Sequence, residues 1–129
     1  MRIRCMALAP TKEQAKQLGA SFNTERTDYD LDLLREYLAI GLGYWQGVAW
    51  VEIVTDGGWL LSVPLFLFEI TDPKASKYWE IRTDGASTTL WPPSLYEPDF
   101  NSQLADDVPS AVETLRELRA LMEAEAFTV

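Results

Sequence analysis

Histidine is absent from this sequence of 129 residues, and cysteine occurs once, as Cys5. The absence of histidine excludes the serine and cysteine nucleophile triads in their usual forms, together with zinc sites built on imidazole. A single cysteine forms no internal disulfide and no thiolate metal site, and we expect Cys5 to be a semi-buried side chain in a short strand. Glycine-rich phosphate-binding motifs are also missing. These absences argue against the common enzyme classes, and we expect no catalytic residue, metal or cofactor.

Positive charge is scarce as well. The sequence has 11 lysine and arginine residues against 20 aspartate and glutamate residues, which gives a formal net charge of −9. Nucleic acids and anionic membrane surfaces are bound by clustered cations, so we expect neither as a partner. The longest apolar run is interrupted at Ser62 and Pro64 and is too short to cross a bilayer. We therefore expect an acidic protein of the cytoplasm.

What is present is typical of a globular protein. Hydrophobic residues make up 47% of the sequence, and its length suits one compact domain, so we expect a single domain over residues 1–129. Helices are predicted over 11–19, 27–40 and 109–126. The second is indicated by Leu31, Leu34 and Leu38 at helical spacing, and Gly41 and Gly43 are expected to end it. The first begins with a capping box formed by Thr11 and Gln14, in which each residue satisfies a backbone amide of the other.

The last of these helices has the strongest signal. Pro109 occupies a favoured first position, and Ser110 with Glu113 fits a second capping box. Apolar residues then recur at helical spacing: Val112, Leu115, Leu118 and Met122.

The middle of the chain has the composition of strands. Two pairs of strands are predicted, each around an Asp-Gly turn: 45–54 with 59–63, and 79–82 with 88–91. Residues 94–107 are predicted to be irregular. The expected fold is α+β: a small antiparallel sheet of about four strands in two hairpins, packed by two N-terminal helices and one C-terminal helix.

Five tryptophans are many for a chain of this length: Trp45, Trp50, Trp59, Trp79 and Trp91. Strands in two hairpins would place several of them on one sheet. There they either pack in the core or a self-association surface, or line a pocket or a partner's groove. We take Trp45, Trp59 and Trp91 as candidate binding residues.

Acidic residues near the last predicted strand are the remaining candidates for chemistry. Glu97 and Asp99, with Asp106 and Asp107 beyond them, have the side chains of an acid–base pair or of a Mg²⁺ or Ca²⁺ site. The alternative is an exposed acidic loop. We therefore take Glu97 and Asp99 as candidate binding residues and assign no metal ligand.

An ordered series of short motifs carries a family resemblance: Asp56-Gly57, Leu61-Ser62-Val63-Pro64-Leu65, Phe68, Trp79-Glu80-Ile81, Asp84-Gly85, Leu90-Trp91-Pro92, Asp99-Phe100 and Leu104. This series, over about residues 45–107, resembles the family of small bacterial proteins catalogued as domain of unknown function 2442. The resemblance implies an α+β fold with a small antiparallel sheet and no established activity. Relatives often lie beside genes resembling toxin–antitoxin partners. The family has no assigned catalytic residues to carry over to this sequence.

The sequence therefore predicts a non-catalytic bacterial protein that binds another protein, in a regulatory or antitoxin-like role, through its aromatic sheet or an amphipathic helix. Homodimerisation is expected, because small domains with spare apolar surface commonly pair with two-fold symmetry. The alternative is a small-ligand-binding protein or a carboxylate-based enzyme. Its aromatic pocket would lie near Trp91, Glu97 and Asp99.

Overall fold

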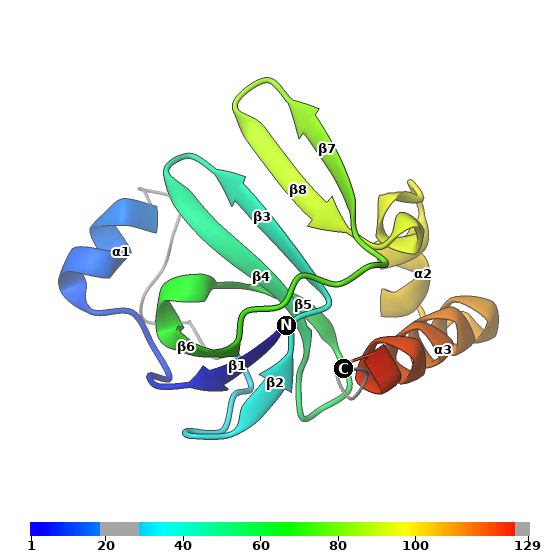
Figure 1. The fold of residues 1–129 in the computed structure, drawn as a ribbon, viewed down its shortest axis with the longest axis horizontal. Coiled ribbons are helices and arrows are strands. Elements are labelled where there is room, and N and C mark those ends of the chain that lie inside the picture. Colours follow the sequence, from blue (N-terminus) through cyan, green and yellow to red (C-terminus); the bar gives the residue numbers. More distant parts are fainter. Residues whose placement is uncertain (19–28, 126–129) are drawn as a thin grey trace.

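The computed structural model describes residues 1–18 and 29–125, and most of their regular structure is β-strand (Figure 1). The strands are β1 (Arg2–Cys5), β2 (Glu36–Leu38), β3 (Gly41–Trp45), β4 (Val48–Val54), β5 (Leu60–Pro64), β6 (Phe68–Asp72), β7 (Glu80–Asp84) and β8 (Ser87–Trp91). The helices are α1 (Lys12–Leu18), η2 (Leu65–Leu67), η3 (Pro93–Tyr96), α2 (Phe100–Ala105) and α3 (Pro109–Glu125). Within the described residues, no helix is long and apolar enough to span a membrane.

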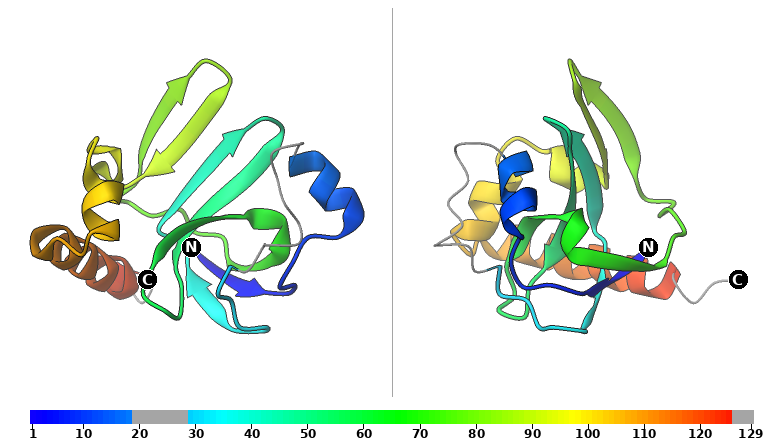
Figure 2. Two further views of the ribbon diagram at one scale, coloured as in Figure 1. Left: turned by 180° about the vertical axis from the view of Figure 1, so that it is seen from behind. Right: turned by 90° about the vertical axis from the view of Figure 1, so that its left-hand side faces the viewer.

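The strands of the described residues form two antiparallel sheets. The small sheet has three strands in the order β2-β1-β6, and the large sheet has five in the order β5-β4-β3-β8-β7. Helices α2 and α3 lie together at one side of the molecule, and α1 lies at the opposite side (Figure 1). The β7–β8 hairpin extends away from the body, and its tip is clear of other elements in every view of Figures 1 and 2.

Because successive side chains of β4 point to opposite faces of the large sheet, the two faces pack in different hydrophobic cores. Val51 and Ile53 are fully buried against Ile3 and Cys5 of the small sheet, so this side is called the small-sheet face. Val54 packs in the other core, on what is called the helix face. That core contains buried side chains of α2 and α3: Phe100, Ala111, Leu115, Leu118 and Met122.

The expected small sheet of about four strands with two N-terminal helices is wrong. The structure has sheets of three and five strands, and residues 29–40 form a loop and β2 in place of the second helix. That helix was predicted from leucines at helical spacing, but Leu34 has a φ of 67° and a side chain that is 61% exposed. The predicted first-helix end at Gly19 and the predicted second-helix start at Thr27 or Asp28 lie outside the described residues.

Gly41 and Gly43, expected to end that helix, lie inside β3. A Cβ atom on Gly41 would lie 2.5 Å from Cδ1 of Trp91, and one on Gly43 would lie 2.6 Å from Cζ3 of Trp45. Both glycines are required because indole rings lie directly against this strand, a close approach that any larger residue would block.

Several local predictions are confirmed. The Gln14 N–H donates to Thr11 Oγ1 at 3.2 Å, and the Thr11 N–H donates to Gln14 Oε1 at 2.9 Å, which is the predicted capping box. Both Asp-Gly turns join antiparallel neighbours, β4 to β5 and β7 to β8. Helix α3 begins at Pro109 as expected, although Ser110 lies inside its first turn and not at the N-cap.

Two features were not predicted. Strands β3 and β4 are joined by Gln46 and Gly47, whose φ angles of 54° and 77° are those of a type I′ hairpin turn. Residues 94–107, expected to be irregular, contain most of η3 and all of α2. Gln-Gly is a weaker turn signal than Asn-Gly or Asp-Gly, and α2 is too short to show a clear period.

The close approach at Gly41 predicts a measurable cost for one added methyl group. Gly41→Ala should lower the free energy of unfolding by about 1–3 kcal/mol, because the new Cβ forces Trp91 or the strand to move. Urea denaturation of the single variant measures this. In a Trp91→Leu background the same change should cost less, and equal costs in both backgrounds would show that the indole is not the obstacle.

Candidate functional site

One end of the large sheet is not covered by the small sheet. A row of neighbouring residues on the small-sheet face crosses all five strands: Val63, Val51, Leu42, Leu90 and Ile81. Val63 and Val51 are fully buried, Leu42 and Leu90 are half-buried, and Ile81 is 67% exposed. The apolar row therefore begins in the core, extends beyond the part of the large sheet that the small sheet covers, and ends on an exposed edge strand.

A second row lies beside the first and is also open. It contains Ala49, Tyr44, Thr88 and Thr83, and the Tyr44 side chain is 51% exposed. Between these rows and Leu65 lies a groove of about 180 Å³. Ile81, Leu90, Leu42 and Tyr44 together are called the open apolar face. Exposed apolar residues that adjoin one another in this way commonly mark an interaction surface.

The strand at this end, β7, is an edge strand. All five of its residues are exposed, and it pairs only with β8 among the described residues. Alternate residues of an edge strand direct their N–H and C=O groups away from the sheet, where another strand can bind them. The helix-face side chains of β7 are charged: Arg82 pairs with Glu80 at 2.9 Å and lies 4.0 Å from the ring centroid of Tyr96.

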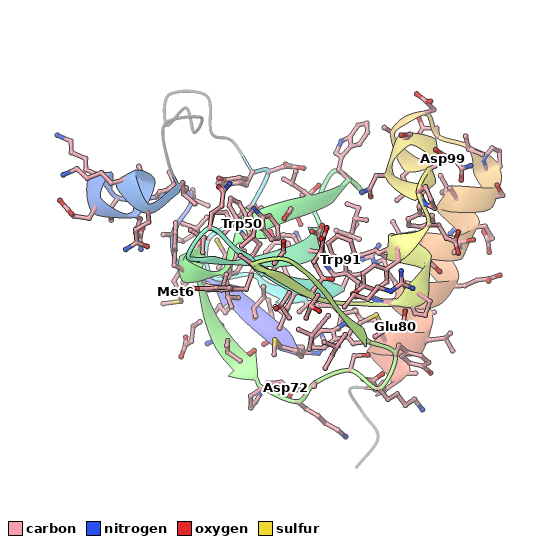
Figure 3. All side chains as sticks on the ribbon, turned by 90° about the horizontal axis from the view of Figure 1, so that it is seen from above. Met6, Trp50, Asp72, Glu80, Trp91 and Asp99 are labelled. Carbon is pink, nitrogen blue, oxygen red and sulfur yellow. The ribbon has the colours of Figure 1, made fainter. Side chains whose placement is uncertain are left out.

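The tryptophans gather mainly on the helix face. Trp45 stacks on Trp50 with ring centroids 5.1 Å apart and an interplanar angle of 7°. Trp91 packs against Tyr96 at 5.0 Å. Figure 3 shows Trp50 and Trp91 over the strands of the large sheet. These rings therefore serve mostly in packing, and Trp45 and Trp91 are both only half-buried.

The other predicted site residues lie apart from this pair. Trp59 is in the β4–β5 turn and is 55% exposed. Glu97 and Asp99 are exposed, and they line a separate cleft of about 310 Å³ between α2 and α3 that Trp91 does not reach. Asp99 is well removed from Trp50 and Trp91 in Figure 3. The five candidates therefore do not form one site.

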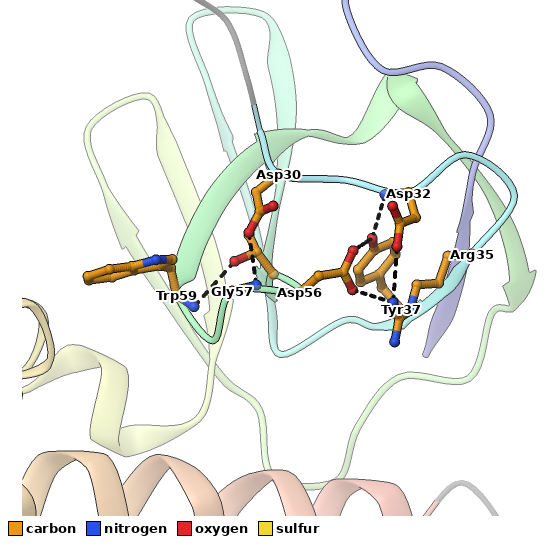
Figure 4. A network of polar contacts seen from close by, with 8 residues as sticks. Asp30, Asp32, Arg35, Tyr37, Asp56, Gly57 and Trp59 are labelled. Atoms are coloured by element: carbon orange, nitrogen blue, oxygen red, sulfur yellow. Dashed lines mark hydrogen bonds and ion pairs between the residues drawn. The ribbon is translucent and has the colours of Figure 1, made fainter.

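The described residues contain no group of three or more acidic, histidine or cysteine side chains that could hold a metal ion. Several carboxylates are instead bound within a network that joins the loop before β2 to the β4–β5 turn (Figure 4). Arg35 contacts Asp32 at 3.1 Å and Asp56 at 2.7 Å, and the Tyr37 hydroxyl donates to Asp56 at 3.1 Å. Hydrogen bonding to Asp32 and the charge of Asp56 raise the pKa of Arg35.

Glu52 is the functional candidate that the sequence interpretation missed. It lies in β4 on the helix face, where burial raises the pKa of its carboxyl group, and the neighbouring Ser62 hydroxyl offsets part of that shift. The available signal was a single charged residue between Val51 and Ile53 in an otherwise apolar strand. The exposed Ile81 and Tyr44 had no such signal. The alternation of apolar and polar residues along a strand shows which side chains share a face, but it does not show which end of the sheet another element covers.

Comparison with protein-family models, with curated proteins and with solved structures finds no match to this chain. The resemblance over residues 45–107 therefore stays a prediction.

The Arg35 network predicts a stabilising role for one carboxylate. Asp56→Ala should lower the free energy of unfolding by about 0.5–1.5 kcal/mol, mainly because the part-buried Tyr37 hydroxyl loses its acceptor, while the exposed Arg35 keeps Asp32 and water as partners. Chemical denaturation measures the loss. Glu117→Ala, an exposed position on α3, is the matched control and should change stability little. Equal effects at the two positions would contradict a role for the network.

The raised pKa of Glu52 predicts a pH-dependent stability. The folded state binds the proton of the Glu52 carboxyl group more tightly than the unfolded state does. The stability that this proton contributes is therefore fully present below the ordinary pKa of 4.5, and it is lost as the pH rises through the raised pKa of the folded state. Glu52→Gln removes the ionisation. Its free energy of unfolding relative to the natural protein should therefore rise between pH 4.5 and neutrality, as measured by urea denaturation. A pH-independent difference would show that the carboxyl titrates normally.

Proposed function

We propose that this protein is a non-catalytic binding module that takes up an extended segment of a partner protein along β7. The observation that carries the proposal is the apolar row that begins in the core at Val63 and ends at exposed Ile81. An uncovered row beside an unpaired strand edge offers both kinds of contact that strand addition uses. Backbone hydrogen bonds supply affinity, and side-chain contacts supply specificity.

The two faces of β7 define the chemistry of the bound segment. On the small-sheet face, Ile81 and Thr83 adjoin the open apolar face, so the segment would place apolar side chains there. On the helix face, Glu80 and Asp84 outnumber Arg82, so the segment would carry basic side chains on its other side. The net charge of −9 favours the same partner over long distances.

Other surfaces support this role less well. The apolar stripe of α3 is already buried against the large sheet, with Leu115, Leu118 and Met122 in the core. Leu121 is the exposed exception on that helix, at 51%. Of the candidate tryptophans, Trp45 and Trp91 are half-buried in ring contacts of their own. We therefore assign the interface to the open apolar face in place of Trp45, Trp91 or the amphipathic helix.

A second copy of the chain is the other occupant that this edge admits. If two β7 strands pair antiparallel with Ile81 opposite Ile81, each Glu80 faces an Arg82 of the second copy, which is a favourable cross-strand pair. A register centred on Arg82 places Glu80 opposite Asp84 and is unfavourable. The regulatory, antitoxin-like role implied by the family resemblance is compatible with either occupant.

Purification of the tagged protein from its native host, followed by light scattering, tests the proposal. Ile81→Lys should abolish the co-purified partner, or convert a dimer to a monomer, because it places a charge in the apolar row and removes an anchor. Losses of more than about 2 kcal/mol are typical of such central residues. Leu121→Lys is the matched control, since it changes another exposed apolar residue, on α3 and away from β7, and it should bind normally.

The opposite effect of the two variants would contradict the proposal. If Ile81→Lys keeps its stoichiometric partner while Leu121→Lys loses it, the interface lies on α3 and the proposal is wrong. Thermal unfolding of both variants shows whether they remain folded.

A further inference from the structure

A carboxyl group lies in the layer between the large sheet and the helices without an ion-pair partner. Glu52 stands on the helix face of β4 between Trp50 and Val54, and no lysine or arginine of the described residues pairs with it. Glu52 is half-buried, and a carboxylate that is partly removed from water is seldom retained without a pair, because removing the charge from water is costly. An unpaired carboxyl at this position is therefore typical of a functional group.

Two further polar groups lie in the same row. Ser62 lies directly opposite Glu52 on β5, and its buried hydroxyl interacts with the Glu52 carboxyl group but forms no hydrogen bond of ordinary geometry. On the other side of Glu52, its neighbour Gly41 leaves room for the indole of Trp91, whose Nε1 is also buried without a partner. Buried polar atoms without an ordinary hydrogen bond are uncommon in native proteins, and two of them in the row of Glu52 require an explanation.

A cavity adjoins Glu52 and Ser62. Its volume is about 230 Å³, several times the roughly 30 Å³ that one water occupies in the liquid. The large sheet forms its floor, and α2 and α3 form its walls, with Leu60, Leu104 and Leu115 as apolar lining. Trp59 and Asn101 also line it. Glu52 is the only titratable side chain among the described residues that line this cavity, and no cation lines it.

We propose that this cavity binds a small organic amine, whose ammonium group contacts the Glu52 carboxylate while its apolar part lies against Leu60, Leu104 and Leu115. Ser62 accepts a second hydrogen bond from the ammonium group. The half-exposed indole of Trp59 provides a π face for the cation. An anionic ligand is disfavoured because the one charge in the cavity is negative and the protein carries a net charge of −9.

The amine and a proton compete for Glu52. Binding requires the carboxylate, so affinity should fall as the pH is lowered through the pKa of Glu52, while the amine stays charged throughout. The elements around the group add no other ionisable side chain to the cavity: β5 contributes Ser62, α2 contributes Asn101 and Leu104, and α3 contributes Leu115. A single titration should therefore describe the pH dependence.

Isothermal titration calorimetry with hexylamine tests the proposal, with hexanol as the neutral probe of equal length. The natural protein should bind hexylamine at least tenfold more tightly than hexanol at pH 7.5, and binding should weaken at pH 4.5. Glu52→Gln should reduce hexylamine affinity at least tenfold. Glu97→Gln, at an exposed carboxylate outside the cavity, is the matched control and should bind as the natural protein does.

A second variant separates the cavity from the charge. Leu104→Phe fills the space without changing the ionisable group, and it should abolish binding of both probes. Hexylamine binding that survives in Glu52→Gln, or equal binding of hexanol and hexylamine, would overturn the assignment. So would the absence of hexylamine binding to the folded natural protein, which would leave ordered water as the only occupant. None of these outcomes bears on the β7 interface.

Discussion

Strand β3 joins the two halves of the large sheet, because it pairs with β4 of one hairpin and with β8 of the other. Its register aligns buried Val51 with Leu42 and then with Leu90, so that one apolar row joins the core to the projecting hairpin. The glycines on its other face admit the indoles of Trp45 and Trp91. Strand β3 thus determines where the open apolar face lies on one side of the sheet and where the tryptophan rings pack on the other.

The two faces of the large sheet offer different chemistry as a result. The small sheet covers the β4–β5 end of one face, and the part left over is apolar and adjoins an unpaired strand edge. On the other face, α2 and α3 enclose a small cavity whose floor contains Glu52 and Ser62. A protein segment suits the first surface, and a small cation suits the second. Because the sites lie on opposite faces, either one can exist without the other.

Sequence reasoning succeeded where the signal was local. The capping box at Thr11 and the Asp-Gly turns depend on residues a few positions apart, and Pro109 marks the start of α3 through its own geometry. The small sheet could not be predicted in this way, since β1 pairs with β2 and β6 from distant parts of the sequence. Gly41 and Gly43 were misassigned for the same reason. Their role is set by indoles of other residues, and a helix end was the nearest local explanation.

The candidate site was harder to predict than the fold. Tryptophans were chosen for their size, but Trp45 and Trp91 contact other rings of the same chain, and Glu97 and Asp99 lie in another cleft. Ile81 and Glu52 depend on which parts of the large sheet are covered, and that depends on long-range pairing. The pattern around Glu52, one charge in an apolar strand, was the only local sign of either residue.

Hydrogen exchange of the protein, alone and with its co-purified partner or as a concentrated dimer, tests the central claim most directly. The account predicts that alternate backbone amides within residues 80–84 become protected in the complex, because a strand added along β7 binds the N–H groups that point away from β8. Amides of β6, the exposed edge of the small sheet, should be unchanged. Protection confined to α3 or to β6, with residues 80–84 exchanging as before, would contradict it.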